Sequence, residues 1–257
     1  MTSTPCSSSN NLRPLLAFVH IPKTAGQAFV RALYTAFPGK VLNITGAETP
    51  GAVANLHLFE RRLRENPDAV VLTSHGLRLA FPETLADRKP LYVTLLRDPY
   101  RQVKSYIRYV KWNYTAFPER VRRFLPQGAD RMSQVDIARR MMDTCPEGYM
   151  ATFHFLPCPF LAMSAEAGPV IERLERFAAV GVVEEINASL ELMRRRLLPQ
   201  GIELPAGPLP RVNESPESGP DDAELDAYQP LRDFLHDYAA ADFEVHAWAQ
   251  RRLGKTR

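Results

Sequence analysis

Four short runs of apolar residues stand out along the chain. They cover Leu15 to Ile21, Ala69 to Thr73, Leu91 to Leu96 and Ala178 to Val183. Each run is continuous rather than alternating, which is typical of strands buried on both faces of a parallel sheet. The pattern therefore predicts a parallel sheet in which both faces are covered.

Apolar residues recur at helical spacing between these runs. They follow Gly26 at intervals of four, and they form one stripe after Pro99. The two sets are Phe29, Leu33 and Phe37, and Val103, Tyr106, Ile107, Val110 and Tyr114. Alternation of strands and helices predicts an α/β fold of three layers, with a central parallel sheet flanked by helices.

The second half of the chain contains further helical segments and one long loop. Residues 118–142 have a helical pattern, and Asn187 to Leu198 is a second amphipathic segment. Residues 204–222 hold five prolines and two glycines, so we expect a loop there. The pattern from Ala223 to Leu253 is helical again.

Length and composition fit one large domain. The 257 residues are 45% hydrophobic, which is enough to bury a substantial core. We expect a disordered tail over residues 1–12 and a single domain over 13–257, with the Pro-rich loop within it. The formal net charge of +3 is too small to indicate nucleic acid as a partner.

The start of the chain shows no pattern of export or membrane insertion. The first dozen residues are small and polar without a basic cluster, and the apolar run LLAFVHI is too short to span a bilayer. We expect a cytoplasmic protein without an integral membrane segment. The three cysteines fit no zinc spacing, and Cys145 and Cys158 either stay reduced or pair in an oxidising compartment.

A polar turn follows the first apolar run in the stretch HIPKTAGQAF, residues 20–29. A helix that begins near Gly26 presents free N–H groups and the positive end of its dipole beyond the strand. Lys23 adds a positive charge, Thr24 adds a hydroxyl, and Gly26 allows close approach of the backbone. The features predict an anion cradle, although a plain strand-to-helix turn also fits. The stretch is not a Walker A loop, because its lysine precedes the glycine.

A second basic stretch, LLRDPYRQVKSYIRY, covers residues 95–109. Asp98 and Pro99 are a good N-cap and first helical residue, and Arg97 ends a strand at the edge where open α/β sheets bind ligands. Further polar residues follow on one helical face, namely Arg101, Ser105 and Arg108. Two anion sites on one rim predict a ligand with two anionic ends, while a solvated basic face remains the alternative.

Both stretches resemble motifs of the sulfotransferases that use 3′-phosphoadenosine 5′-phosphosulfate, in particular carbohydrate sulfotransferases related to heparan sulfate 2-O-sulfotransferase. HIPKTAGQAF is similar to the phosphosulfate loop and LLRDPYRQVKSYIRY to the 3′-phosphate motif. The segments TSHGLRLAF, AVGVVEEINASLELMRRRL, RVNES and PLRDFLHDYAAADFEVHAWA also resemble family segments, in the right order over nearly the whole chain. The resemblance implies the P-loop-kinase-like fold of that family.

The resemblance also implies roles for individual residues. His75 would be the general base, and Lys23 would stabilise the leaving phosphate, which suits in-line sulfuryl transfer without a metal. The implied ligands of the cofactor are Lys23, Thr24, Ala25, Gly26 and Gln27 for the phosphosulfate, Arg97 and Ser105 for the 3′-phosphate, and Arg211 in the long loop. Gln27 and Ala28 depart from the family, which often has hydroxyl residues there.

We therefore expect an enzyme that transfers a sulfuryl group from this cofactor to a hydroxyl of a carbohydrate or glycolipid, releasing adenosine 3′,5′-bisphosphate. One alternative is a catalytically silent nucleotide- or glycan-binding module, which the altered Gln27 and Ala28 would favour. The other is a small-molecule kinase, although no strand ends in the acidic residue that magnesium requires. Of the other histidines, we expect His20 to be packed, and His154 is a candidate for the acceptor cleft.

Overall fold

The computed structural model describes residues 12–44, 52–78, 81–116, 119–122, 125–210 and 220–255. Residues 1–11 of the expected tail and Arg211 of the candidate site lie outside the described residues. The described residues form an α/β fold with a central, all-parallel sheet flanked by helices, as the apolar runs predict.

The sheet has five strands in the order β2-β3-β1-β4-β5. They are β1 (Arg13–Val19), β2 (Val41–Asn43), β3 (Val71–Ser74), β4 (Arg88–Leu96) and β5 (Ala179–Val182). The four apolar runs correspond to β1, β3, β4 and β5, whose residues are mostly buried. Sequence analysis missed β2, because this three-residue edge strand is only half-buried and has no continuous apolar run.

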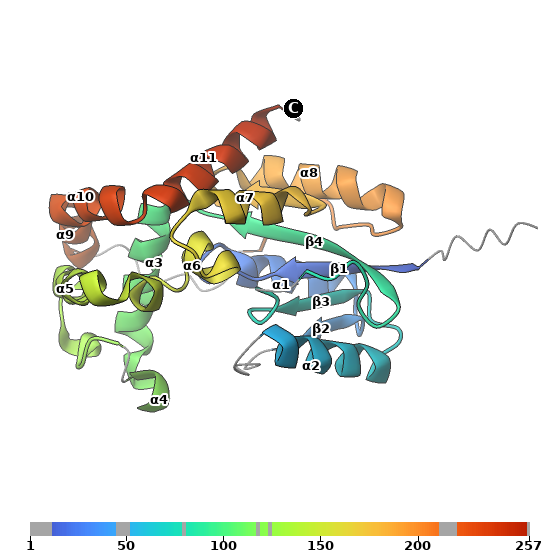
Figure 1. The fold of residues 1–257 in the computed structure, drawn as a ribbon, viewed down its shortest axis with the longest axis horizontal. Helices are drawn as coiled ribbons and strands as arrows, with labels where there is room; N and C mark the ends of the chain where they lie inside the picture. Colours follow the sequence, from blue (N-terminus) through green and yellow to red (C-terminus); the bar gives the residue numbers. More distant parts are fainter. Residues whose placement is uncertain are drawn as a thin grey trace, which may run out of the picture.

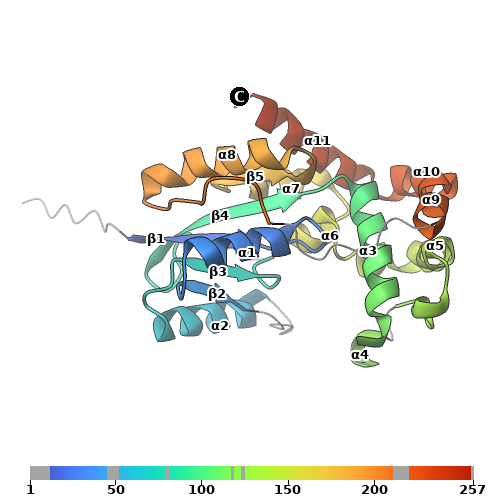
Figure 2. The same cartoon turned by 180° about the vertical axis from the view of Figure 1, so that it is seen from behind.

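Helices pack on both faces of this sheet (Figures 1 and 2). The helices around it are α1 (Gly26–Ala36), α2 (Ala52–Glu65), α6 (Pro157–Ala162), α7 (Ala167–Glu175), α8 (Ile186–Leu197) and α11 (Ala240–Gly254). Their apolar side chains form one hydrophobic core with the strands. The predicted segments after Gly26 and Asn187 correspond to α1 and α8.

A second hydrophobic core lies beyond the carboxyl ends of the strands. In both views α3 stands between the sheet and α9 and α10. The elements are α3 (Pro99–Asn113), α5 (Gln134–Thr152), α9 (Pro220–Ala227) and α10 (Gln229–Tyr238). Buried residues of this core include Ile107, Phe155, Leu225 and Leu231. The carboxyl edge of the sheet therefore faces α3.

Two expectations about the helical half are wrong in detail. The segment 118–142 is not one helix: α4 (Glu119–Arg122), a 3₁₀ turn (Ala129–Arg131) and α5 are separated by a break at Gly128, which has a φ of 73°. The last segment is helical, as expected, and consists of α9, α10 and α11. The loop predicted over 204–222 ends earlier, because α9 begins at Pro220, and proline fits the first helical turn.

No helix within the described ranges is both long enough and apolar enough to cross a membrane. Cys145 and Cys158 are buried free thiols, so the alternative in which they pair is wrong.

Candidate functional site

The candidate residues gather at the carboxyl edge of the sheet. β1 lies between β3 and β4, and the segments that follow these three strands carry Lys23, His75 and Arg97. Connections from the central strands leave to both sides at this point, which is where ligands bind in open α/β sheets. The sequence placed these three residues at one edge, and the structure brings them together there.

The loop between β1 and α1 has an unusual backbone. Lys23 and Ala25 have φ angles of 66° and 58°, in the left-handed region that non-glycine residues rarely occupy. Thr24 lies between them, fully buried, and its hydroxyl donates to the carbonyl of Ile21 at 2.9 Å. The hydroxyl therefore holds the loop together, whereas sequence analysis expected it to face the anion.

Gly26 begins α1 beside the ring of His20. A Cβ atom at Gly26 would overlap that imidazole, so no other residue fits without moving it. His20 also stacks on Phe18, with ring centroids 5.5 Å apart. Burial is the main cause that lowers the pKa of His20 to about 3, and electrostatic interactions with His75 and Lys23 lower it further, so the ring stays neutral. His20 is the packed residue that the sequence predicts, and its packing explains the glycine.

His75 follows β3 and lies against His20. The two rings are 4.2 Å apart, and Nδ1 of His75 lies 2.5 Å from the backbone carbonyl of His20. A carbonyl oxygen has no proton to give, so Nδ1 carries the proton and Nε2 keeps its lone pair. His75 is exposed, but desolvation by the protein around it still lowers its pKa, against the raising effect of this hydrogen bond, which favours the neutral ring. His75 therefore has the protonation state that a general base needs.

The loop that holds His75 is fixed by its neighbour Ser74. The hydroxyl of Ser74 donates to the carbonyl of Ile44 at 2.7 Å and accepts the N–H of Gly76 at 2.9 Å. These bonds tie the turn after β3 to the segment after β2.

The ammonium group of Lys23 lies over an aromatic ring of α3. Its Nζ is 4.1 Å from the centroid of Tyr109. Burial and the positive charges of Arg97 and Arg108 lower the pKa of Lys23 to about 8. An anion that bound among these three cations would relieve their repulsion and raise this pKa again.

Arg97 connects the two candidate anion sites directly. Its Nη1 donates to the backbone carbonyl of Lys23 at 3.2 Å, across 74 residues of sequence. Burial lowers the pKa of Arg97, partly offset by Glu184. Its Nε is buried and has no hydrogen-bond partner among the described residues. Such an orphaned donor of a charged group is costly unless a ligand satisfies it.

The helix that follows Arg97 begins with well-formed caps. The side chain of Asp98 accepts the N–H of Arg101 at 2.9 Å, as its predicted N-cap role requires. Oε1 of Glu184 accepts the N–H of Asp98 at 3.2 Å, and Oε2 lies 3.1 Å from Nε2 of His246. Burial alone would raise the pKa of Glu184, but the hydrogen bonds from His246 and Asp98 outweigh it and lower the pKa.

Gln102 is a positioning residue that sequence analysis missed. It is fully buried on α3, and its Nε2 donates to the carbonyls of Pro22 and Phe155, both at 2.8 Å. It therefore holds the loop that contains Lys23 against α3. In the sequence, Gln102 is a polar residue next to the apolar stripe of the predicted helix. This pattern does not identify the two carbonyls to which its side chain donates.

A cavity of about 700 Å³ opens beside α3. Arg97 and Ser105, the two expected 3′-phosphate ligands, both line it, whereas His75 and Lys23 do not. Its other lining residues are Asp98, Tyr100, Arg101, Lys104, Arg108, Asp226, Arg232, His236 and Phe243. Five of the lining residues are Lys or Arg and two are Asp, so the cavity is suited to an anion.

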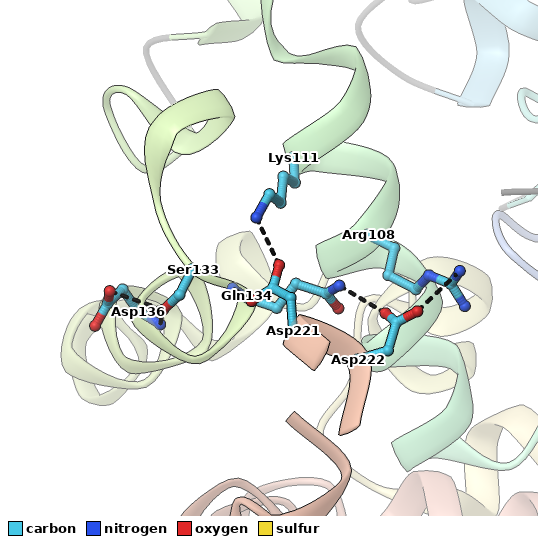
Figure 3. A network of polar contacts seen from close by, with 7 residues as sticks. All are labelled: Arg108, Lys111, Ser133, Gln134, Asp136, Asp221 and Asp222. Atoms are coloured by element: carbon cyan, nitrogen blue, oxygen red, sulfur yellow. Dashed lines mark hydrogen bonds and ion pairs between the residues drawn. The ribbon is translucent and has the colours of Figure 1, made fainter. Parts of the chain in front are cut away.

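Basic residues of α3 are paired with aspartates of α9 (Figure 3). Lys111 lies 2.5 Å from Asp221, and Arg108 lies 3.2 Å from Asp222. Lys104 pairs with Asp226 in the same way, at 2.5 Å. The basic face of α3 is therefore not simply solvated. No local pattern in the sequence predicts these pairs, since the two helices are more than a hundred residues apart.

Two further candidate residues from the sequence lie at the surface. Gln27 is exposed at the start of α1, and His154 is exposed with its ring centroid 6.1 Å from that of Tyr106. No group of three or more His, Cys, Asp or Glu side chains within the described ranges has the arrangement of a metal site. Comparison with known proteins adds no assignment, because no family model matches the chain and no curated protein matches it.

Proposed function

We propose that the chain is a sulfotransferase of the P-loop-kinase-like type, which transfers a sulfuryl group from 3′-phosphoadenosine 5′-phosphosulfate to a hydroxyl of a carbohydrate or glycolipid. One observation carries the proposal: Arg97 donates a hydrogen bond to the backbone of Lys23, so the two motifs that resemble the family's phosphate sites form one rim. The cavity that contains both Arg97 and Ser105 supports the assignment of the 3′-phosphate.

The residues can carry out an in-line transfer. Nε2 of His75 takes the proton of the acceptor hydroxyl while the acceptor oxygen forms its bond to sulfur. The bond between sulfur and the bridging oxygen breaks, and adenosine 3′,5′-bisphosphate leaves with the electron pair. Lys23 stabilises the negative charge that develops on this leaving group. The neutral ring of His75, which is exposed after β3, and the positive charge of Lys23 support these roles.

The first experiment measures nucleotide binding by calorimetry. We expect the wild-type chain to prefer adenosine 3′,5′-bisphosphate over AMP, ADP and ATP, with no effect of magnesium. Arg97→Ala should weaken binding of the bisphosphate about a hundredfold, because it removes a charged hydrogen-bond donor. Arg140→Ala, on the exposed face of α5, is the matched control and should bind normally.

Each other outcome supports a different function. Preference for ATP with magnesium would indicate a kinase. That reading is disfavoured by the two acids beside Arg97, since Asp98 caps α3 and Glu184 is bound to His246. Failure to bind any nucleotide would refute the proposal.

The second experiment tests transfer. His75→Ala should abolish sulfation across a panel of saccharide acceptors while the affinity for the bisphosphate stays unchanged. His57→Ala, on the exposed face of α2, controls for loss of a histidine. If the wild-type chain binds the bisphosphate but sulfates no acceptor in the panel, the silent binding module becomes the better description.

A further inference from the structure

Two exposed aromatic rings lie on the C-terminal half of α3. Tyr109 is 36% exposed and Trp112 is 56% exposed, and neither residue belongs to either hydrophobic core. They are three residues apart, so they share one face of the helix. Packing gives no reason for a tryptophan at this position, whereas aromatic residues are enriched on protein surfaces that bind partners.

The side chains on this face of α3 follow the direction of the proposed transfer. Ser105, a proposed ligand of the 3′-phosphate, lines the cavity near the start of the helix. Tyr109 lies one turn further, and there Nζ of Lys23 is 4.1 Å from the centroid of its ring. Trp112 lies beyond Tyr109, about 10 Å from Ser105 along the helix axis. An acceptor in line with the leaving group lies on the far side of Lys23 from Ser105, which is the side of Trp112.

The position of α3 in the fold agrees with this order. In Figures 1 and 2, α3 runs from the level of β4 past the level of β3 at the carboxyl edge of the sheet. β1 and Lys23 come between β4 and β3 in the sheet order, and His75 follows β3. The C-terminal half of α3 is therefore on the same side of β1 as the proposed general base.

The size of this surface suits a small ligand better than a second protein. An aromatic side chain buries about 150–250 Å² when it is covered completely, so the two rings offer at most about 500 Å². A stable protein partner covers about 800 Å² on each side. A sugar ring has the matching size and chemistry, because the C–H groups of one face pack on an aromatic ring while its hydroxyl groups point outward from the edge.

Polar groups beside Trp112 suit the hydroxyl groups of such a ring. Nζ of Lys111 is 6.0 Å from the centroid of Trp112 and pairs with Asp221 of α9 (Figure 3). The carboxylate of Asp221 also accepts the N–H of Gln134 at 2.9 Å, and its side chain is 29% exposed. A carboxylate has about four lone-pair sites, so Asp221 has acceptor capacity left for a hydroxyl of the ligand.

We propose that Trp112 and Tyr109 form an aromatic platform on which a sugar ring of the acceptor stacks, with Asp221 accepting hydrogen bonds from its hydroxyl groups. The inference rests on the proposed function, because it takes the hydroxyl that receives the sulfuryl group to belong to a saccharide. It assigns the donor to the N-terminal half of α3 and the acceptor to the C-terminal half.

Binding of neutral oligosaccharides tests the platform. The protein is titrated with cellohexaose, chitohexaose and maltohexaose in the presence of adenosine 3′,5′-bisphosphate, by calorimetry and by tryptophan fluorescence. We expect at least one of them to bind, and to shift the emission of Trp112 to shorter wavelength as the ring leaves water. Trp112→Ala should bind this oligosaccharide at least tenfold more weakly, and Asp221→Asn about threefold more weakly.

The chain has one other tryptophan, which provides the matched control. Trp248→Phe on α11 should keep both the affinity and the shift in emission, because its ring lies beside Arg252 on a different helix. If no oligosaccharide of the three binds, or if Trp112→Ala binds it as wild type does, the platform is overturned. A dimer that forms in wild type and is lost in Trp112→Ala would also overturn it, because a second copy would then cover the rings.

The nucleotide separates this inference from the proposed function. Trp112→Ala should bind adenosine 3′,5′-bisphosphate with a Kd within about twofold of wild type, since its ring is outside the cavity that holds Ser105. A large loss of nucleotide affinity in this variant would overturn the division of α3 into a donor half and an acceptor half. A wild-type chain that does not bind the bisphosphate would instead refute the proposed function.

Discussion

The loop after β1 and the face of α3 form the two sides of the candidate site, and their positive charges are stabilised differently. On α3, Arg108 and Lys104 each pair with an aspartate of α9. On the loop, no ion pair joins Lys23 to a carboxylate among the described residues, and its ammonium lies over Tyr109. Arg108 and Lys104 are therefore neutralised by carboxylates without a ligand, whereas Lys23 is not.

This difference indicates that a bound anion would stabilise the charge of Lys23 more than the charges of Arg108 and Lys104. A partly buried cation without a counter-ion has a lowered pKa, as Lys23 does, whereas a paired cation keeps its charge. The loop also relies on close packing around His20 and Gly26 rather than on ion pairs. We infer that substitutions that alter packing disrupt the structure of the loop after β1. Substitutions that alter charge on α3 change the affinity of the site for an anion instead.

The largest effect is expected from Gly26→Ala. The new methyl group overlaps the ring of His20, so the loop must shift, and the free energy of unfolding should fall by about 3 kcal/mol, with loss of nucleotide binding. Urea unfolding and calorimetry measure both. Gly168→Ala in α7 is the control, because nothing lies near its Cβ, and it should raise stability by about 0.5 kcal/mol. An unchanged Gly26→Ala protein would contradict the packing argument.

The second effect concerns the connection between the two sides. Gln102→Leu removes both hydrogen bonds to the carbonyls of Pro22 and Phe155, which lie inside the protein. We expect a loss of about 2 kcal/mol in the free energy of unfolding, because the carbonyls lose their partner. Gln200→Leu, at an exposed position, should change stability little. Equal stability of the two variants would show that the hydrogen bonds of Gln102 do not stabilise the contact between the loop and α3.

The third effect is a dependence of binding on pH. Lys23 binds an anion in its protonated form, and its pKa of about 8 means that this form is lost from the free protein as pH rises through 8. Affinity for adenosine 3′,5′-bisphosphate should therefore fall about tenfold between pH 7 and pH 9. Lys23→Gln should bind weakly at both values and lose this slope. If the affinity of Lys23→Gln still fell as pH rises, another titrating group would be responsible for the pH dependence.

The smallest effect is expected from Tyr109→Leu. This change removes the ring beneath the ammonium of Lys23, a cation–π contact worth about 0.5 kcal/mol at a partly exposed site. Binding of the bisphosphate should weaken by about twofold. Trp112→Leu is the control on the same helix, since its exposed ring lies 6.0 Å from Lys111 instead. A similar effect of both changes would show that the contact between Tyr109 and Lys23 does not contribute to binding.

Much of the sheet and of its ligand edge could be predicted, because local signals encode them. The continuous apolar runs correspond to buried strands, and Asp98 and Pro99 start α3 as capping rules require. Since parallel strands end at the same edge, Lys23, His75 and Arg97 could be placed together without coordinates. The short strand β2 and the divided C-terminal helices lacked such signals.

The sequence by itself determined the apolar runs, the breaks at proline and glycine, and the residue types at the carboxyl edge. Only the tertiary structure decided that the hydroxyl of Thr24 turns inward, that Gly26 makes room for His20, and that Asp222 holds Arg108. The physical reason is that strands and caps depend on neighbouring residues, whereas these contacts depend on packing. Their consequences, including the lowered pKa of Lys23, exist only once distant segments have buried one another.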